Sequence, residues 1–332
     1  MSFSDLKIAI IGSGKWGINH VKTAVQLLGA QSVIVCDTFP AAESKVKAVS
    51  PDINFVTDLG SVISDSSINA VVVATPAETH FEVAKQLLES GKNVMVEKPI
   101  TLYSSEAKQL LDIAIAGNLK LMVGHVLLFH PAIIKLKEQV TAGKIGKLQY
   151  IYSNRLNLGT IRSEENILWS FAPHDISIIQ HLTGSDPISV FAKGADLVQH
   201  NIEDTTLTYL VYPNNVHAHI FVSWLHPFKE QRLIVIGEKG MFVFEDSLKT
   251  EKLKFYPKGF KKVNGNLEKF ESDYEVVDFG NSQPLAEEHK HFYDCILNNK
   301  KPLTDGQHAL EVLKILEQAQ EGLTAVNNLK SN

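Results

Sequence analysis

The sequence predicts an α/β protein of two domains, an N-terminal doubly wound parallel sheet followed by a domain rich in antiparallel strands. Three observations support this prediction. Short apolar strands alternate with amphipathic helices up to residue 124, a glycine-rich turn follows the first strand, and most later strands are separated by turns alone. A length of 332 residues is also typical of two domains. We therefore expect domains at residues 1–124 and 125–332.

The predicted strands of the first domain are apolar on both faces, as expected where helices cover both sides of a parallel sheet. Right-handed crossovers between such strands give a doubly wound fold. The predicted strands are Lys7–Ile11, Ser32–Asp37, Ile53–Val56, Ala70–Ala74, Asn93–Glu97 and Lys120–Gly124. The helices predicted between them are Gly17–Gly29, Glu43–Val49, Asp58–Ser64, Glu78–Ser90 and Ser104–Ala116.

After residue 124 most of the predicted strands follow one another across turn signals, which indicates antiparallel hairpins. The predicted strands are Leu148–Asn154, Ile188–Lys193, Thr205–Tyr212, Val216–Trp224, Arg232–Gly237 and Met241–Glu245. The predicted helices are Pro131–Ala142, Pro173–Leu182, Leu285–Asn298 and Asp305–Val326, the last with Asp305 as its N-cap. The lysine-rich stretch 252–277 holds a strand or two without a clear boundary.

Composition excludes several classes of function. A formal charge of -5 argues against a nucleic-acid partner, because no strongly basic face can displace phosphate counterions. No apolar run approaches the roughly 20 residues that span a bilayer, and no signal peptide is visible at the N-terminus. Cys36 and Cys295 are too few for a disulfide framework, so we expect a cytoplasmic protein. His217 and His219 lack a third ligand at typical spacing, so we expect no metal site.

The glycine-rich turn is Gly12-Ser13-Gly14-Lys15-Trp16-Gly17, which follows a strand and opens a helix. In such a turn Gly12 permits the tight bend, Gly14 lets the backbone approach a pyrophosphate, and Gly17 allows close packing of the helix on the strand. Asp37 ends the second strand, where a carboxylate accepts hydrogen bonds from ribose hydroxyls and repels a 2′-phosphate. The sequence therefore predicts NAD as the cofactor and disfavours NADP.

Further motifs follow the later strands of the first domain. Thr75-Pro76 follows the fourth strand with His80 just beyond it, Glu97-Lys98-Pro99 follows the fifth, and His125 follows the sixth. Another motif, His174-Asp175-Ile176, lies in the second domain. Together with the glycine turn, this order of motifs resembles the Gfo/Idh/MocA oxidoreductase family over nearly the whole chain.

The resemblance implies a Rossmann domain and an α/β domain with a large, mostly antiparallel open sheet. It also implies oxidation of a sugar or cyclitol hydroxyl with a nicotinamide cofactor, and a homo-oligomer, a dimer or tetramer, that forms through the open sheet face. The residues expected to contact the cofactor are Gly12, Gly14, Lys15, Trp16, Gly17, Asp37, Thr75, Pro76, His80, Glu97, Lys98 and His125.

Removing a hydride from a carbinol carbon requires a base for the hydroxyl proton and a group that stabilises the substrate oxygen. The Lys98 ammonium suits the oxygen, and His174, which titrates near neutrality, suits the role of base. Glu97 is expected to position the nicotinamide ribose. Many family members carry an aspartate four residues before the histidine, but here that position is Ser170. Asp175 points about 100° away from His174 on a helix, which leaves the proton route open.

The segment before His174 carries two of the chain's three arginines, Arg155 and Arg162. Arginine binds phosphate through paired hydrogen bonds, and the segment resembles that of the UDP-N-acetylglucosamine 3-dehydrogenase type. We therefore expect oxidation at C3 of a nucleotide-activated amino sugar. The residues expected to contact substrate are Lys98, Arg155, Asn157, Arg162, Trp169, His174 and Asp175.

Three alternatives remain open at this point. The two arginines could instead pair with Glu164, Glu165 or another subunit. The substrate could be a cyclitol or free sugar, which needs no guanidinium for a diphosphate. The chain could also be a regulator that senses a dinucleotide without catalysis, although the presence of both Lys98 and His174 argues against this.

Overall fold

The computed structural model describes residue 3 and residues 6–330, with side chains described up to residue 324. It divides into two compact units. Unit 1 comprises the described residues of 1–129 and 282–313, and unit 2 those of 130–281 and 314–332. Each unit contains one large sheet, sheet A in unit 1 and sheet B in unit 2.

Sheet A has six parallel strands in the order β3-β2-β1-β4-β5-β6, so the predicted doubly wound fold is confirmed. The strands are β1 (Ile8–Ile11), β2 (Val33–Cys36), β3 (Asn54–Val56), β4 (Ala70–Val73), β5 (Asn93–Glu97) and β6 (Leu121–Gly124). Every residue of β1, β2, β4 and β6 is buried, which shows that both faces of the sheet are covered. The order reverses between β1 and β4, where ligands of such sheets bind beyond the carboxyl ends of the strands.

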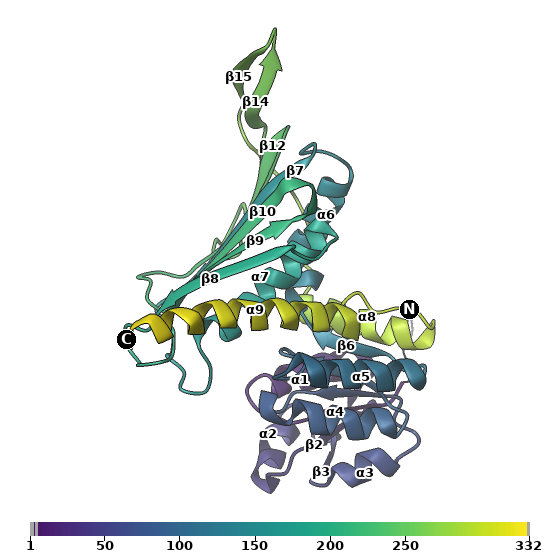
Figure 1. Ribbon diagram of the computed structural model, residues 1–332. Coiled ribbons are helices and arrows are strands. Elements are labelled where there is room, and N and C mark those ends of the chain that lie inside the picture. Colours follow the sequence, from purple (N-terminus) through teal and green to yellow (C-terminus); the bar gives the residue numbers. More distant parts are fainter. Residues whose placement is uncertain (1–2, 4–5, 331–332) are drawn as a thin grey trace. The chain divides into compact units, whose positions relative to one another are not determined.

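Helices connect the strands of sheet A, and one further helix returns from the far end of the chain. The helices are α1 (Gly17–Leu28), α2 (Glu43–Lys47), α3 (Leu59–Ser64), α4 (His80–Glu89), α5 (Ser104–Ala116) and α8 (Pro284–Leu297). Helix α8 packs against α1, and α4 packs against α5 (Figure 1). Short 3-10 turns are η1 (Ala30–Ser32), η2 (Pro40–Ala42), η3 (Ala77–Thr79), η4 (Val126–Phe129) and, in unit 2, η5 (Pro213–Asn215).

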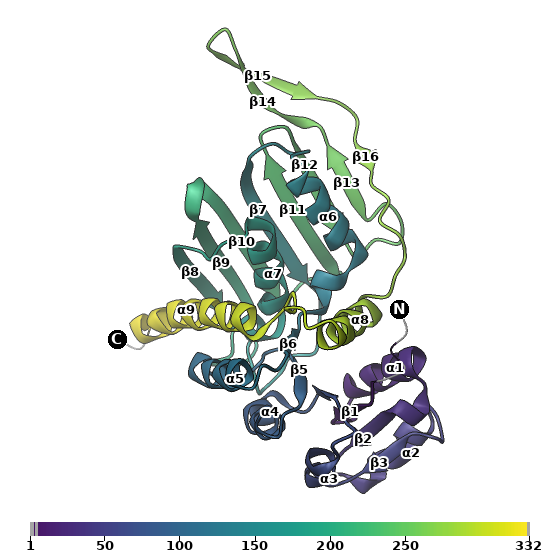
Figure 2. The ribbon, with the colours of Figure 1, turned by 90° about the vertical axis from the view of Figure 1, so that its right-hand side faces the viewer.

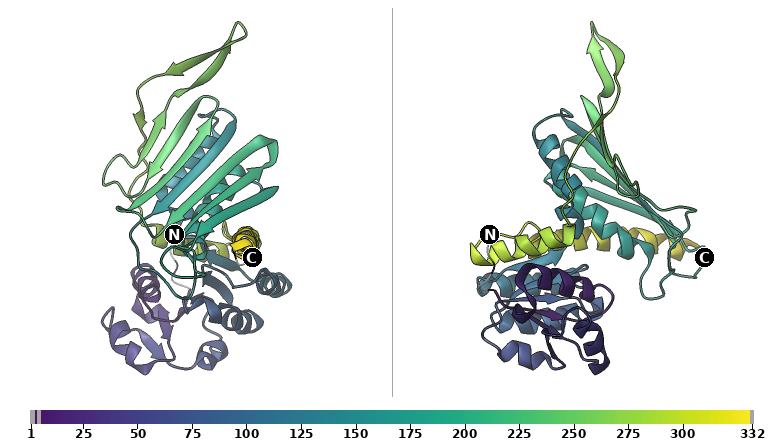
Figure 3. Two further views of the ribbon diagram at one scale, coloured as in Figure 1. Left: turned by 60° about the vertical axis from the view of Figure 1, so that its left-hand side comes forward. Right: turned by 180° about the vertical axis from the view of Figure 1, so that it is seen from behind.

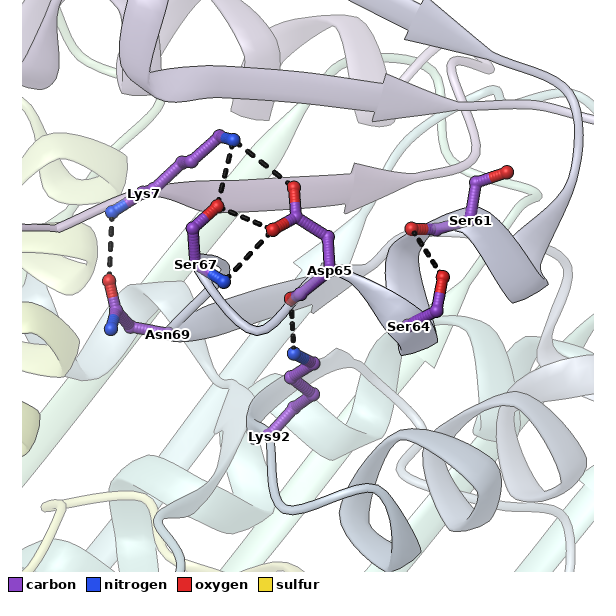
Figure 4. Close-up of polar contacts among 7 residues, drawn as sticks. All are labelled: Lys7, Ser61, Ser64, Asp65, Ser67, Asn69 and Lys92. Carbon is purple, nitrogen blue, oxygen red and sulfur yellow. Dashed lines mark hydrogen bonds and ion pairs between the residues drawn. The ribbon is translucent and has the colours of Figure 1, made fainter.

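Polar contacts occupy the end of sheet A where the strands begin (Figure 4). Lys7, just before β1, donates from Nζ to Asp65 Oδ2 at 3.1 Å and from its backbone N–H to Asn69 Oδ1 at 3.1 Å. Lys92, just before β5, donates to the Asp65 carbonyl at 2.6 Å. These contacts fasten the amino ends of three neighbouring strands together. The opposite, carboxyl edge carries the predicted functional motifs.

Sheet B has the order β16-β13-β12-β11-β7-β10-β9-β8. Strand β7 pairs parallel with β10, and the other pairings in the sheet are antiparallel. The strands are β7 (Leu148–Leu156), β8 (Ser189–Ala195), β9 (Thr205–Tyr212), β10 (Val216–Ser223), β11 (Glu230–Gly237), β12 (Gly240–Glu245), β13 (Leu253–Tyr256) and β16 (Glu275–Val276). A separate hairpin, β14 (Lys258–Val263) and β15 (Asn266–Glu271), extends beyond the sheet (Figure 1). The mostly antiparallel second domain is thus confirmed.

Helices α6 (Pro131–Thr141) and α7 (Ile167–Thr183) lie over one face of sheet B (Figure 2). Within the described part of the chain, no helix lies over the centre of the other face (Figure 3, left). Burial alternates along β9, β10 and β12, as it does in a sheet that is covered on one side only.

Helix α7 begins earlier than predicted. Proline is common at the first position of a helix, so Pro173 marked the expected start. In the structure Asn166 caps the helix by accepting the Trp169 backbone N–H at 3.3 Å, and Pro173 lies inside it. The side-chain cap therefore decides where the helix starts, and a proline within it is tolerated.

The segment 282–313 differs from the expected division, because we placed all residues after 124 in the second domain and this segment lies in unit 1. The cause is that part of this segment forms hydrogen bonds with β6, the edge strand of sheet A. Val123 of β6 donates its N–H to the Thr304 carbonyl at 2.8 Å, and its carbonyl accepts the Thr304 hydroxyl at 2.7 Å. The predicted cap of helix α9 (Gly306–Lys330) is confirmed, since Asp305 Oδ1 accepts the His308 N–H at 2.9 Å.

Candidate active site

The glycine turn has the geometry that its three glycines predict. Gly12 has a φ of +88°, and a Cβ there would lie 2.9 Å from the Ala74 carbonyl oxygen. A Cβ on Gly17 would lie 2.1 Å from the Gly12 carbonyl oxygen, so α1 packs as closely as it does only because this residue is glycine. A Cβ on Gly14 would meet nothing within 4 Å. The backbone at Gly14, beside the start of α1, is therefore open to a phosphate group.

Asp37 follows β2 and faces this turn. Its Oδ2 accepts the Ser13 backbone N–H at 2.8 Å and the Ser13 hydroxyl at 2.6 Å, and its Oδ1 accepts the Phe39 N–H at 3.0 Å. Burial alone would raise the pKa of Asp37, but these hydrogen bonds and the charge of Lys45 outweigh it and hold the pKa below its usual range. The carboxylate is thus ionised beside the turn, as a ribose acceptor requires.

Lys45 was not predicted as part of this region. Its Nζ donates to the Ser13 carbonyl at 3.1 Å, which brings a positive charge to the glycine turn. The sequence held no specific signal for this contact, because Lys45 is one of two lysines on a short surface helix.

Three predicted residues, Thr75, Pro76 and His80, lie beyond β4, where His80 joins the loop after β4 to the loop after β5. His80 is buried, and its ring lies between two carbonyl oxygens, that of Thr75 at 2.9 Å from Nε2 and that of Pro99 at 2.8 Å from Nδ1. Because both ring nitrogens are engaged, His80 links the loop after β4 to the loop after β5. Its predicted contact with the cofactor remains a prediction, as do those of Thr75 and Pro76.

Glu97 and Lys98 lie at the carboxyl end of β5. Glu97 Oε1 accepts hydrogen bonds from the Trp16 indole Nε1 and from His20 Nε2, and Oε2 accepts the Lys98 backbone N–H at 3.2 Å. Desolvation would raise the pKa of Glu97, but hydrogen bonds from His20 and Trp16 and the charge of Lys98 hold it below its usual range. Glu97 is thus an ionised carboxylate that joins the glycine turn to the lysine loop. Lys15 and Trp16 themselves are exposed.

His125 follows β6 at the same edge. Burial, with the neighbouring charges of His308 and Lys98, lowers its pKa well below the usual range, so the imidazole is neutral. Neither ring nitrogen has a hydrogen-bond partner within the part of the chain that the structure describes. A buried polar group without a partner is costly, so this ring suits a partner that a ligand supplies. With the open Gly14 backbone and the ionised Asp37, this edge fits a nicotinamide dinucleotide.

The predicted residues of unit 2 lie on β7, on α7 and in the segment between them. Asp175 is buried and accepts hydrogen bonds from Arg155 Nε at 2.9 Å, Arg155 Nη2 at 3.0 Å and the Ser153 hydroxyl at 2.7 Å. Arg162 forms an ion pair with Glu165 at the surface. Arg162 thus pairs with Glu165, as one open alternative expected, whereas Arg155 pairs with Asp175, a partner that alternative did not name. A substrate phosphate would have to compete with these pairs.

The remaining predicted residues of unit 2 surround the start of α7. The Trp169 indole N–H donates to Gln320 Oε1 at 3.0 Å, and the same oxygen accepts the Asn166 side-chain amide at 2.9 Å. His174 and Ser170 lie further along α7, with His174 half-buried and Ser170 buried. Asn157 follows β7, next to Gly159. Contact of any of these residues with substrate stays a prediction.

The sequence did not predict four further residues of unit 1. His20 contacts Glu97, His289 contacts His20, and Tyr293 contacts His289. Glu288 is close enough to Glu97 for the charge of Glu97 to act on it. His289 and Tyr293 are spaced to share one face of α8, which is a visible signal, but nothing in the sequence pairs that face with α1.

The described residues hold neither a cluster suited to a metal ion nor a helix suited to a membrane. In this part of the chain no group of three His, Cys, Asp or Glu side chains is placed to hold a metal ion. Nor does any helix within the described ranges have the length and apolar character that crossing a membrane requires.

Comparison with known proteins agrees with this arrangement. The family model for the oxidoreductase family with an NAD-binding Rossmann fold matches residues 6–125, and the model for the GFO/IDH/MocA C-terminal domain matches residues 133–243. A scyllo-inositol 2-dehydrogenase (NAD(+)) from Bacillus subtilis is 26% identical, over 98% of this chain and 95% of its own length. A UDP-N-acetylglucosamine 3-dehydrogenase from Acidithiobacillus ferrooxidans is 28% identical, over 78% of this chain and 80% of its own.

Solved structures show the same fold. The structure of the Acidithiobacillus ferrooxidans enzyme matches with a TM-score of 0.82 at 24% identity, covering 96% of this chain and 98% of that one. A levoglucosan dehydrogenase in complex with NADH and levoglucosan matches with a TM-score of 0.82 at 18% identity, covering 96% of this chain and 97% of its own. The two family models together span most of the chain. The chain belongs to the GFO/IDH/MocA family of oxidoreductases with an NAD-binding Rossmann domain.

Proposed function

We propose that the chain is an NAD-dependent dehydrogenase that oxidises a ring hydroxyl of a sugar or cyclitol, with C3 of UDP-N-acetylglucosamine as the first candidate position. The observation that carries this proposal is the carboxyl edge of sheet A, where the open Gly14 backbone, the ionised Asp37 and the Glu97-Lys98 loop occur in one unit. Similarity to a UDP-N-acetylglucosamine 3-dehydrogenase supports the candidate substrate.

Bound NAD⁺ supplies the hydride acceptor. In the proposed reaction the Lys98 ammonium donates a hydrogen bond to the substrate oxygen and stabilises the charge that develops there. His174 takes the hydroxyl proton, a role that an imidazole can fill as general base. The hydroxyl of Ser170 carries no charge that could orient this imidazole, and Asp175 is held by Arg155 and Ser153. The proposed base therefore acts without a free carboxylate from its own helix.

A cyclitol is the second candidate, and one observation favours it. Arg155 is held by the buried Asp175, and Arg162 by Glu165, so neither guanidinium is ready for a diphosphate. A neutral polyol needs no such group, and similarity to a scyllo-inositol 2-dehydrogenase agrees with it. Arg162 is 51% exposed, and a surface ion pair of this kind is worth little, so Arg162 is the arginine that a substrate phosphate could recruit.

Turnover on two substrates separates the candidates. The purified protein is incubated with NAD⁺ and either UDP-N-acetylglucosamine or an inositol, and absorbance of the reduced nicotinamide is followed. If a diphosphate recruits Arg162, Arg162→Gln raises KM for the UDP-sugar about tenfold, the value of one charge-assisted contact, while an inositol serves as the internal control. An unchanged KM for the UDP-sugar removes the diphosphate role, and NADH binding without turnover on either substrate favours the regulator.

We also propose a homo-oligomer in which a second copy covers the open face of sheet B. One row across this face runs Phe191, Tyr209, His219, Tyr152 and Ile234, all in register on neighbouring strands. Phe191 is 61% exposed and Tyr209 is 37% exposed, although apolar and aromatic side chains gain from burial.

The two cysteines are free and buried, which fits the proposed cytoplasmic location.

A further inference from the structure

A chain of buried side chains in unit 1 leads from α8 to the end of β5. The Tyr293 hydroxyl lies 2.8 Å from His289 Nδ1, and His289 Nε2 lies 2.8 Å from His20 Nδ1. His20 Nε2 then lies 2.8 Å from Glu97 Oε1. His20, His289 and Tyr293 have no measurable exposure, so water does not compete for these contacts.

These side chains can all find partners only if their hydrogen bonds run in one direction, from Tyr293 towards Glu97. Burial raises the pKa of Tyr293, so its hydroxyl keeps its proton, and His289 is its only hydrogen-bond partner among the described residues. Tyr293 therefore donates to His289 Nδ1. Burial also lowers the pKa of His289 well below the usual range, so the ring is neutral and carries its proton on Nε2. His289 then donates to His20 Nδ1, and His20 donates from Nε2 to Glu97.

Glu97 is the acceptor at the end of this chain and the junction of two loops. Oε1 receives His20 and the Trp16 indole of the glycine turn, and Oε2 receives the Lys98 backbone N–H. The carboxylate also lies against Gly124 of β6, where a Cβ would be 3.0 Å from both Oε1 and the carboxyl carbon. The carboxylate is thus held on several sides, by residues of α1, β6, the glycine turn and the loop after β5.

We propose that Glu97 is a positioning residue that holds the glycine turn at Trp16 and the lysine loop at Lys98 in one arrangement, and that His20, His289 and Tyr293 orient the hydrogen bond that anchors it. The inference rests on the proposed function in one respect, that Lys98 is the group that meets the substrate. It differs from a direct contact of Glu97 with the nicotinamide ribose, because the carboxylate acts here through Trp16 and Lys98.

The same geometry argues against a proton channel. A channel to solvent must end at an exposed group, but the chain ends at Tyr293, which is fully buried and keeps its proton. The four groups therefore form a fixed anchor rather than an exit for the proton released by the reaction.

The first test uses NADH binding, which needs no knowledge of the substrate. Dissociation constants are measured by nicotinamide fluorescence for the wild type, Trp16→Phe, Glu97→Ala and the double variant. We expect Trp16→Phe, which keeps the ring but loses the indole donor, to weaken NADH about tenfold in the wild type and less than about twofold in Glu97→Ala. Equal factors in the two backgrounds would show that Trp16 acts without Glu97 and would overturn the proposal.

A second test addresses the hydrogen-bonded side chains from Tyr293 to Glu97 with a matched pair of tyrosines. Tyr293→Phe removes the first donor of the chain, whereas Tyr212→Phe removes a buried hydroxyl without a hydrogen-bond partner in the described part of unit 2. We expect Tyr293→Phe to weaken NADH about threefold and Tyr212→Phe to leave it unchanged. An equal change of NADH affinity in the two variants would show that the side chains from Tyr293 to Glu97 do not act together, and it would contradict the proposal.

A third measurement needs no substitution in the protein that is studied. Nitrogen NMR of the wild type reports the tautomer of each histidine, with His20→Asn and His289→Asn used for assignment. We expect His20 and His289 both to carry a proton on Nε2, and His289, whose pKa burial lowers well below the usual range, to remain neutral from pH 6 to 8. The opposite tautomer in either ring would overturn the proposed direction. If the wild type fails to bind NADH, the proposed function fails. The tautomers still show whether the hydrogen bonds from Tyr293 to Glu97 run in the proposed direction.

Discussion

Glu288 of α8 offers a test of the electrostatics around Glu97. Its side chain is fully buried, and neither carboxyl oxygen has a hydrogen-bond partner among the residues that the structure describes. Burial, together with the neighbouring charge of Glu97, raises the pKa of Glu288 well above its usual range. We therefore predict that Glu288 is a neutral acid in the folded protein and that Glu288→Gln, a neutral side chain of the same shape, relieves a pH-dependent cost.

The sign and size follow from proton binding. A raised pKa in the folded state contributes stability that is complete below the unfolded pKa, about 4.3 for glutamate, and is lost as the pH rises towards the folded pKa. Across this window the folded state holds one more proton than the unfolded chain. The wild type therefore loses about 1.4 kcal/mol of unfolding free energy per pH unit that Glu288→Gln retains.

Denaturant unfolding of both proteins at pH 5, 6 and 7 measures the difference. We expect the unfolding free energy of Glu288→Gln, relative to the wild type, to rise by about 1.4 kcal/mol with each pH unit while both proteins stay folded. Comparison of slopes removes any constant cost of the amide itself. A difference that does not change with pH would show that Glu288 is ionised like an ordinary glutamate and would refute the charge assignment.

Four further predictions concern the cofactor, the reaction, the second unit and its open face. Lys98→Ala should lower kcat by about 10²-fold or more in the turnover assay while NADH affinity stays within about twofold, since one positioned proton donor is lost. Asp37→Ser should shift the ratio of kcat/KM values from NAD towards NADP, because it removes the repelling carboxylate and leaves Lys45 near the glycine turn. Asp175→Asn should lower the unfolding free energy by about 3 kcal/mol in urea, because it leaves a largely buried guanidinium without its charged partner. Tyr152→Glu should shift the mass measured by light scattering towards the monomer, because it places charge in the centre of the proposed interface.

The sequence carried enough information for most of unit 1. Alternating apolar strands and helices predicted sheet A, and the three glycines predicted the turn that Gly12, Gly14 and Gly17 form. These features are local, since each depends on periodicity or on the backbone freedom of single residues. Asp305 as the cap of α9 was predicted for the same reason.

Features that depend on contacts between distant segments could not be predicted. His20 and His289 are 269 positions apart in the chain, and no pattern in either helix indicates that they meet. The ion pair between Arg155 and Asp175 was also not predicted, because helix geometry relates Asp175 only to its neighbours along the helix, such as His174. We predicted that α7 begins at Pro173, but the Asn166 side chain caps it earlier and Pro173 lies inside the helix.

We propose that the Lys98 ammonium and the His174 imidazole act together on a substrate at the nicotinamide. A crystal structure of the protein with NADH bound tests it most directly, through the distances of Lys98 Nζ and the His174 ring from the nicotinamide C4 atom. We predict that both groups lie on the same side of the ring, within hydrogen-bond reach of one substrate oxygen. A structure in which only one of them faces the nicotinamide, or in which the dinucleotide does not lie along Gly14, would contradict it.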